Sequence, residues 1–185
     1  MDLKDKNILV GITGSIAAYK AVYLVSSLKS ENANVNVVMT ENAAKFVTPL
    51  TFQTLSQNKV YVNMFEEKVD WKIEHISLAD KSDLIVVVPA SANIIGKIAN
   101  GIADDLLSTV IMSCKSPVLF APAMNVNMYE NPIVQSNIKK LEKSGYFFVG
   151  PDTGKLACGT IGKGRLTETD KIIEKIKQLL NKVGR

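Results

Sequence analysis

The residues from Val118 to Pro132 bring together several side chains that suit ligand binding. The segment VLFAPAMNVNMYENP opens as a short apolar run, which predicts a buried strand, and then turns into polar residues. Pro132 predicts the start of a helix, because proline is favoured where its missing N–H would have no partner. Ligands of open α/β sheets bind beyond the carboxyl ends of the strands. Asn125 is therefore placed to donate amide hydrogens to a carboxylate without adding a charge.

Two further residues could carry chemistry. His75 is the only histidine in the chain and the only side chain whose ordinary pKa lies near neutrality, so it is a candidate general acid or base. Cys158 lies in a glycine-rich segment, and reactive cysteines favour such sites when cations are near. The nearby cations are Lys155, Lys163 and Arg165. Cys114, within an apolar helical run, is expected to be a packed thiol.

Small or hydroxyl-bearing residues follow three of the predicted strands, at Gly14-Ser15, Thr40 and Ser91-Ala92-Asn93. Such ends suit a bound phosphorylated cofactor whose ring supplies the reactivity. The dinucleotide fingerprint GxGxxG is absent after the first strand, and residues 150–155 lack the spacing of a Walker loop. These absences disfavour an NAD enzyme or an ATPase but leave a mononucleotide phosphate open.

The elements that must position these residues alternate between strand and helix. Strands are predicted at 7–12, 35–40, 60–64, 84–88, from 118, and at 146–149. Helices are predicted after Ser15 as N-cap, within 43–55 and 94–114 with breaks at Pro49 and Gly101, and at 132–143 and 167–183. Residues 65–82 are expected to be irregular, and residues 150–164 to form a loop. The alternation predicts an α/β, Rossmann-like (flavodoxin-like) doubly wound parallel sheet in a single domain, residues 1–185.

Composition excludes several classes of protein. A net charge of +4 suits phosphorylated ligands but lacks the dense basic patch of a nucleic-acid binder. Two distant cysteines and one histidine predict neither a metal site nor a disulfide framework. Neither a signal peptide nor an 18-residue apolar stretch is visible, so no membrane association is expected and the predicted location is cytoplasmic.

Taken together, these motifs resemble those of a known family, the flavin-dependent cysteine decarboxylases. The resemblance rests on the isolated histidine and on the segments GSIAAYK, PASAN, NGIADDLL, PAMNVNMYENP and ACGTIGKGRL, which cover about residues 5–175 in the expected order. PxMNxxM and ACGxxGxGR are the specific motifs. The second of them favours the branch of the family that acts in coenzyme A biosynthesis on a phosphorylated pantothenoyl-cysteine conjugate.

The resemblance implies a cofactor, FMN, bound between the subunits of a homotrimer, with four trimers often forming a dodecamer. It implies cofactor contacts from Gly14, Ser15, Thr40, Ser91, Ala92, Asn93 and Ala123. It implies a substrate site formed by Asn125, Met128, Ala157 and Gly159. It implies three catalytic residues: His75 as the active-site base, Asn125 as the carboxylate ligand and Cys158 as the proton donor on a flexible lid.

The same resemblance implies how the reaction proceeds. A carboxylate on an sp³ carbon has no electron sink, so direct loss of CO₂ is very slow. In the family, flavin oxidises the cysteinyl CH₂–SH to a thioaldehyde, CO₂ leaves, and the resulting enethiol is reduced again and protonated. An amide ligand such as Asn125 holds the carboxylate without stabilising its ground-state charge as an ion pair would.

The sequence departs from the family pattern at Tyr129, where tryptophan is frequent, and at Asp105, where asparagine is commoner. Three alternatives remain open at this point: a peptidyl-cysteine decarboxylase, a flavin prenyltransferase, and a non-catalytic flavin-binding regulator of a phosphatase. The first two lack the ACG lid, and the third carries long acidic tails. Many bacterial members are also fused to a C-terminal ligase that makes the substrate, which is a possible partner here.

Overall fold

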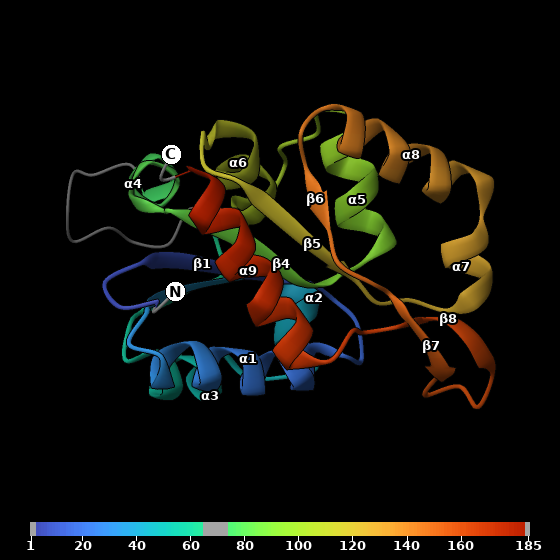
Figure 1. Ribbon diagram of the computed structural model, residues 1–185, viewed down its shortest axis with the longest axis horizontal. Helices are drawn as coiled ribbons and strands as arrows, with labels where there is room; N and C mark the ends of the chain where they lie inside the picture. The colour runs from blue at the N-terminus through green and yellow to red at the C-terminus, as the bar shows by residue number, and fades with distance from the viewer. Residues whose placement is uncertain (1–2, 65–73, 184–185) are drawn as a thin grey trace.

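A computed structural model describes residues 3–64 and 74–183. Its centre is a six-stranded sheet in which every pairing is parallel, with the strand order β3-β2-β1-β4-β5-β6 (Figure 1). The strands are β1 (Asn7–Ile12), β2 (Asn34–Met39), β3 (Val60–Tyr61), β4 (Leu84–Ala90), β5 (Val118–Pro122) and β6 (Phe147–Phe148). This order is that of Rossmann-type sheets, and it reverses between β1 and β4. The predicted doubly wound parallel sheet is confirmed.

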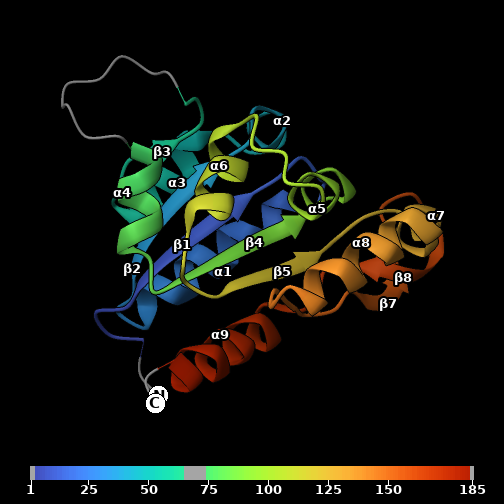
Figure 2. The ribbon, with the colours of Figure 1, turned by 90° about the horizontal axis from the view of Figure 1, so that it is seen from above.

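Helices cover both faces of the sheet (Figures 1 and 2). One face packs against α1 (Ala18–Ser30), α3 (Pro49–Ser56) and α9 (Thr169–Val183). The opposite face packs against α4 (Glu74–Lys81), α5 (Ala92–Ala99), α6 (Leu106–Ser113) and α8 (Pro132–Lys143). Two short helices, α2 (Glu41–Ala44) and α7 (Val126–Glu130), follow the ends of β2 and β5. In the part of the chain described, no helix has the length and apolar character needed to cross a membrane.

The central strands form because nearly every residue in them is apolar. In β1, Ile8 and Val10 enter the core on one face of the sheet while Leu9 enters the core on the other. In β4, Val86 and Val87 divide between the faces in the same way. This alternation with a period of two is what a strand buried on both faces requires. Each predicted strand is present. The predicted helix at 132–143 is also present, as α8.

Three local predictions are wrong. Residues 150–164, expected to be a loop, contain an antiparallel hairpin of β7 (Asp152–Lys155) and β8 (Ile161–Arg165). Part of the segment expected to be irregular, residues 65–82, is helical as α4. Ser15 is not the N-cap of α1, because the helix begins at Ala18 after a turn in which the Ser15 N–H donates to the Thr13 carbonyl.

The β7–β8 hairpin is attached to the body of the protein through glycines. The Met124 N–H donates to the Gly164 carbonyl at 3.0 Å. A Cβ added to Gly164 would lie 2.3 Å from the Met124 carbonyl oxygen, and one added to Gly162 would lie 2.7 Å from Val126. Backbone approaches of this kind are possible only without a side chain. The glycines that suggested a loop therefore allow the hairpin to pack against the segment after β5.

We expect Gly164→Ala to separate the hairpin from this segment. Because the new methyl group would meet backbone that cannot rotate away, the free energy of unfolding should fall by about 1–3 kcal/mol. Chemical denaturation measures this change, and limited proteolysis within residues 152–165 reports on the hairpin. Gly96→Ala is the control, because its Cβ would meet nothing closer than 3.8 Å. Equal stability and equal proteolysis of the two variants would contradict the expectation.

Candidate active site

Two pockets open at the carboxyl ends of the central strands. The larger, with a volume of about 870 Å³, lies beyond β1, β2 and β4. It is lined by six of the residues that the sequence indicated: Gly14, Thr40, Ser91, Ala92, Asn93 and Met128. Ligand sites typically have volumes of roughly 300–1,000 Å³, so this pocket can hold a cofactor of mononucleotide size. Its place beside the point where the strand order reverses is where such sheets bind ligands.

A buried hydroxyl fixes the floor of the larger pocket. Thr13, which is 1% exposed, donates its Oγ1 hydrogen to the Pro89 carbonyl at 2.7 Å. The same oxygen accepts from the Ser91 N–H at 3.0 Å. The two bonds join the end of β1 to the end of β4, so the two loops that line the pocket hold one relative position. Thr13 was missed from the sequence, where its only signal is a hydroxyl between an apolar strand and a glycine.

The hydroxyls at the strand ends also cap helices. Thr40 accepts from the Ala43 N–H at 3.2 Å and Ser91 accepts from the Ile94 N–H at 3.4 Å. Each hydroxyl keeps its own hydrogen for donation into the pocket. A Cβ on Gly14 would lie 2.7 Å from Asn42, so this turn too requires glycine. Together these groups form a small, donor-rich wall that fits an anionic ligand.

Asp105, the unusual residue of the sequence, lines this pocket in a defined role. Its carboxylate caps α6 by accepting from the Ser108 N–H at 2.8 Å, and it binds the Lys97 ammonium at 2.7 Å. Lys97 also pairs with Asp104 at 2.6 Å. Burial alone would raise the pKa of Asp105, but the bonds from Lys97 and Ser108 outweigh it and lower the pKa below its ordinary value. The Asp105 charge is thus paired within the protein, with Lys97 shared between two carboxylates.

The effect of Asp105 on stability should depend on pH. Because its pKa is lower in the folded protein than in the unfolded chain, its contribution is present above about pH 4 and is lost as the pH falls through the folded value. Asp105→Asn keeps a good cap and removes only the charge, so we expect a loss of less than about 1 kcal/mol at pH 7. Urea unfolding at pH 7 and at pH 3 should show this loss shrinking at the lower pH. A loss that is constant with pH would contradict the assignment.

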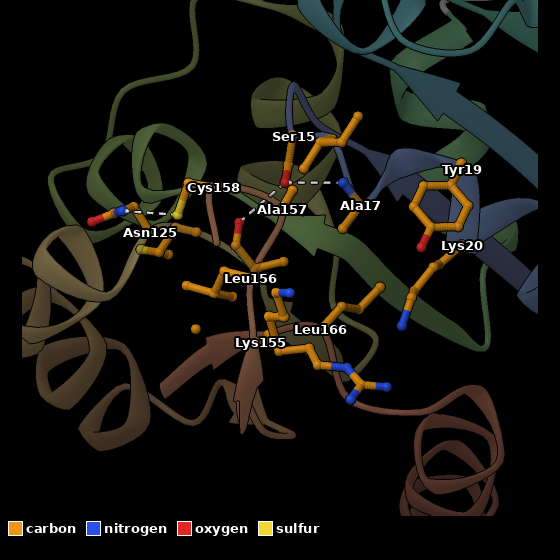
Figure 3. A pocket seen from close by; sticks show the side chains of 15 residues that line it. Ser15, Ala17, Tyr19, Lys20, Asn125, Lys155, Leu156, Ala157, Cys158 and Leu166 are labelled. Carbon is orange, nitrogen blue, oxygen red and sulfur yellow. Dashed lines mark hydrogen bonds between the residues drawn. The ribbon is translucent and has the colours of Figure 1, made fainter. Parts of the chain in front are cut away.

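The smaller pocket, with a volume of about 330 Å³, lies between α1, the end of β5 and the hairpin (Figure 3). Five of the predicted site residues line it: Ser15, Ala123, Asn125, Ala157 and Cys158. Ser15 Oγ donates to the Ala123 carbonyl at 3.3 Å and accepts from the Ala17 N–H at 3.3 Å. Gly14 and Ser15 are consecutive and each faces a different pocket, so the two pockets are neighbours.

Asn125 is held in a fixed orientation at the mouth of the smaller pocket. As the N-cap of α7, it accepts the Asn127 N–H on Oδ1 at 2.8 Å. This bond leaves the amide hydrogens of Nδ2 to face the hairpin, where Nδ2 lies 3.7 Å from Cys158 Sγ (Figure 3). The structure therefore brings together two predicted residues that are far apart in the sequence. The amide can donate to a carboxylate bound beside the thiol.

Cys158 is exposed in the turn of the hairpin. Its thiol lies 3.5 Å from Thr160 Oγ1. Hydrogen bonds from the Thr160 hydroxyl and N–H, and secondarily from the Asn125 amide, stabilise the thiolate and lower the pKa of Cys158 below its ordinary value. Cys114 differs because burial raises the pKa of its thiol. Of the two cysteines, only Cys158 therefore combines access with a lowered pKa. The causes are Thr160 and Asn125, not the nearby cations that the sequence indicated.

We expect Thr160→Val to raise the pKa of Cys158, because the hydroxyl that stabilises the thiolate is lost. In a Cys114→Ser background, alkylation of the remaining thiol by iodoacetamide should become several-fold slower at neutral pH, with its pH profile moved upward. Thr160→Ser, which keeps the hydroxyl, is the control. Identical profiles for the valine and serine variants would contradict the role of the hydroxyl.

Other predicted residues lie elsewhere. His75 belongs to α4, but its side chain lies outside the described residues. Gly159 lines neither pocket and instead forms the hairpin turn at a φ of +87°. Met128 lines the larger pocket rather than the one beside Asn125. Tyr129 is buried, with the Lys163 ammonium 5.5 Å from its ring centre, so this aromatic side chain reaches the hairpin.

Comparison with known proteins agrees with this arrangement. A family model described as Flavoprotein matches residues 1–181. The coenzyme A biosynthesis bifunctional protein CoaBC of Bacillus subtilis is 52% identical over 93% of this chain and 42% of its own length. The probable phosphopantothenoylcysteine decarboxylase of Streptococcus mutans is 47% identical over 95% of this chain and 99% of its own length. The chain thus spans less than half of the bifunctional relatives and almost all of the shorter one.

Solved structures share the fold. A mutant PPC decarboxylase complexed with pantothenoylaminoethenethiol superposes with a TM-score of 0.83 at 30% identity, over 95% of this chain and 98% of the other. The FMN-dependent cysteine decarboxylase SpaF superposes with a TM-score of 0.84 at 26% identity, over 99% of both chains. Two kinds of decarboxylase therefore match the fold equally well, and the identities of the sequences favour the first kind.

Proposed function

The chain belongs to the Flavoprotein family, and from that premise we propose that it uses FMN to decarboxylate phosphopantothenoylcysteine to phosphopantetheine in coenzyme A biosynthesis. The observation that carries the proposal is the pairing of the Asn125 amide with the Cys158 thiol beside a pocket of cofactor size. This pairing offers one donor for a carboxylate and one acidic thiol, the two groups that the reaction needs at its reacting carbon. The enzyme is accordingly a carboxy-lyase.

The larger pocket fits FMN. The pocket lies where the strand order reverses, which is the usual ligand site of such sheets. It also offers a glycine turn and the hydroxyls that cap two helices, and these groups suit the phosphate of FMN. The residues that would hold the cofactor are Gly14, Thr40, Ser91, Ala92 and Asn93, with Ser15 and Ala123 on the side of the smaller pocket. When bound, FMN supplies the two-electron acceptor that loss of CO₂ from a saturated carbon otherwise lacks.

The side chains of the smaller pocket bind and protonate the substrate. Asn125 donates to the carboxylate, and because the amide is neutral it does not stabilise the ground-state charge that disappears with CO₂. Cys158 holds a proton on Sγ that it can deliver to the decarboxylated carbon, and its lowered pKa makes it a better acid than an ordinary thiol. The hairpin that carries Cys158 lines one side of the pocket and would help to exclude water from bound substrate. We assign His75 as the base near the substrate by the family resemblance.

The proposal extends to the assembly of the protein. We propose that residues 1–185 form the decarboxylase domain and that it acts in the cytoplasm as a homotrimer or a dodecamer. Either a fused or a separate phosphopantothenoylcysteine synthetase would supply the substrate, as in the bifunctional relatives. The arrangement of subunits can be tested by light scattering of the FMN-loaded protein.

The test of function is the anaerobic addition of phosphopantothenoylcysteine to the protein purified with FMN. We expect a yellow protein that releases CO₂ and a product lighter by the mass of CO₂, detected by mass spectrometry. A yellow protein that is inert to this substrate but decarboxylates a peptide with a C-terminal cysteine would be a peptidyl-cysteine decarboxylase. A protein that never binds FMN would overturn the proposal entirely.

A further inference from the structure

Three cationic side chains line the smaller pocket, and the proposed chemistry uses none of them. Lys20 comes from α1, Lys155 ends β7, and Arg165 ends β8. None of the described residues that line this pocket is acidic. The elements that contribute the three cations are far apart in the sequence, so their convergence depends on the packing of the hairpin against the segment after β5. Among them, Lys20 was not singled out by its sequence context.

The charge of this cluster is only partly balanced. Glu168, outside the pocket lining, pairs with Arg165 and lies 3.9 Å from the Lys20 ammonium. Lys155 has no ion pair within the described part of the chain. One carboxylate against three cations leaves two positive charges. A phosphate monoester carries about −1.5 to −2 at pH 7, so it would complete the balance.

The burial of Lys20 strengthens this reading. Its side chain is 21% exposed, whereas the Glu168 carboxylate that faces it is 53% exposed and already engaged by Arg165. Among the described residues, the ion-pair partner of the Lys20 ammonium is therefore distant and shared with Arg165. An anion in the pocket would supply the missing close partner. Arg165 in turn lies across Gly154, where an added Cβ would be 3.1 Å from Arg165 Cδ, so its guanidinium is held near the pocket.

Lys20 and the reacting groups lie on opposite sides of the pocket. In Figure 3, Asn125 and Cys158 lie on one side, Lys20 lies on the other, and Lys155 lies below. Apolar side chains separate them, among them Leu156, Ala157 and Leu166. A ligand that fits would carry a thiol and a carboxylate at one end, a mostly uncharged middle, and a dianion at the other end.

We propose that Lys20, Lys155 and Arg165 form the site that binds the phosphate group of the substrate. This inference rests on the proposed function and adds to it the residues that select a phosphorylated small molecule over a peptide ending in cysteine. Binding would be charge-assisted, with Arg165 able to donate two parallel hydrogen bonds. The phosphate would then anchor the substrate at a distance from the bond that breaks.

The test compares phosphopantothenoylcysteine with its dephosphorylated form on the FMN-loaded protein. The variants are Lys20→Gln, Lys155→Gln and Arg165→Gln, and Lys163→Gln is the control because this hairpin lysine contacts Tyr129 instead of the pocket. Hydrogen bonds between charged groups contribute about 1.5–3 kcal/mol, which corresponds to roughly 10- to 100-fold in kcat/KM per variant. We expect this fall, mainly through KM, for the phosphorylated substrate only.

Equal losses on both substrates would overturn the proposal, as would an equal loss in Lys163→Gln. Lys155 is exposed and without an ion pair in the described chain, so its variant should fold even if the others do not. Calorimetry with phosphopantetheine and pantetheine gives a readout independent of turnover. If the wild-type protein decarboxylates neither substrate, the proposed function fails. The phosphate site then fails separately only if the wild-type protein binds the two pantetheine compounds equally.

Discussion

Replacing Asn125 with aspartate should lower kcat/KM for the cysteine substrate by at least about two orders of magnitude. The substitution would place a carboxylate opposite the carboxylate of the substrate, and like charges in contact cost several kcal/mol. The fold should survive, because aspartate can accept the Asn127 N–H as Asn125 Oδ1 does and is an equally good N-cap. Steady-state release of CO₂ measures the loss.

Asn127→Asp is the matched control for this prediction. It adds the same charge two residues away, on a side chain that lines neither pocket. Its activity should remain within a few-fold of that of the unmodified protein. If both aspartate variants lose activity to the same extent, the effect of Asn125→Asp reflects the general charge of the segment, and Asn125 does not bind the carboxylate.

Cys158→Ser should abolish steady-state turnover while leaving the early steps in place. A serine hydroxyl is a far weaker acid than a thiol whose pKa is already lowered, so protonation of the decarboxylated carbon should slow by more than about 10²-fold. We expect a single burst of CO₂, close to one equivalent per site. The accumulating product should be lighter than phosphopantetheine by two hydrogens, and mass spectrometry under anaerobic conditions would detect it.

The control for this variant is Cys114→Ser. Cys114 lies outside both pockets, at the end of α6, where its thiol donates to the Ile111 carbonyl at 3.2 Å. Its replacement should leave turnover intact. Normal turnover in Cys158→Ser would show that the proton comes from another donor, and an absent burst would show that the thiol acts before CO₂ leaves.

The fold could be predicted where an apolar run or an amphipathic pattern was strong enough to identify a strand or a helix. Strands β1, β4 and β5 are buried on both faces, so their apolar runs could fit nothing but the centre of a parallel sheet. Helix α8 combines a proline at its first position with a regular amphipathic pattern, and its predicted bounds are correct. These elements needed no knowledge of distant contacts.

The hairpin was mistaken for a loop because its stabilising contacts are not local. Gly154, Gly162 and Gly164 remove the side chains that would have shown the alternation of a strand. The need for glycine at 162 and 164 becomes clear only in the structure, where Val126 lies against Gly162 and the Met124 carbonyl lies against Gly164. For the same reason no spacing rule could predict that Cys158 would meet Asn125, although the family resemblance named both residues.

The site was partly predictable at the level of residue type. The structure places Gly14, Thr40 and Ser91 at one pocket, because parallel strands of a sheet end on the same edge. The roles of Thr13 and Asp105 could not be predicted, because a buried hydrogen-bonded bridge and an ion pair depend on which loops come together. The convergence of Lys20 with Arg165 likewise required the docked hairpin.

The two pockets draw their walls from different parts of the chain. The walls of the larger pocket come from the sheet and its first loops. Cys158, Lys155 and Arg165 all come from the hairpin between Asp152 and Arg165, which contacts the segment after β5 through a backbone hydrogen bond and several side chains. Exchange of that hairpin between relatives would transfer the proposed acid, Cys158, and two of the three proposed phosphate-binding residues in one step. Substrate preference could therefore diverge in this family by replacement of a single segment, without change to the part of the protein that binds the cofactor.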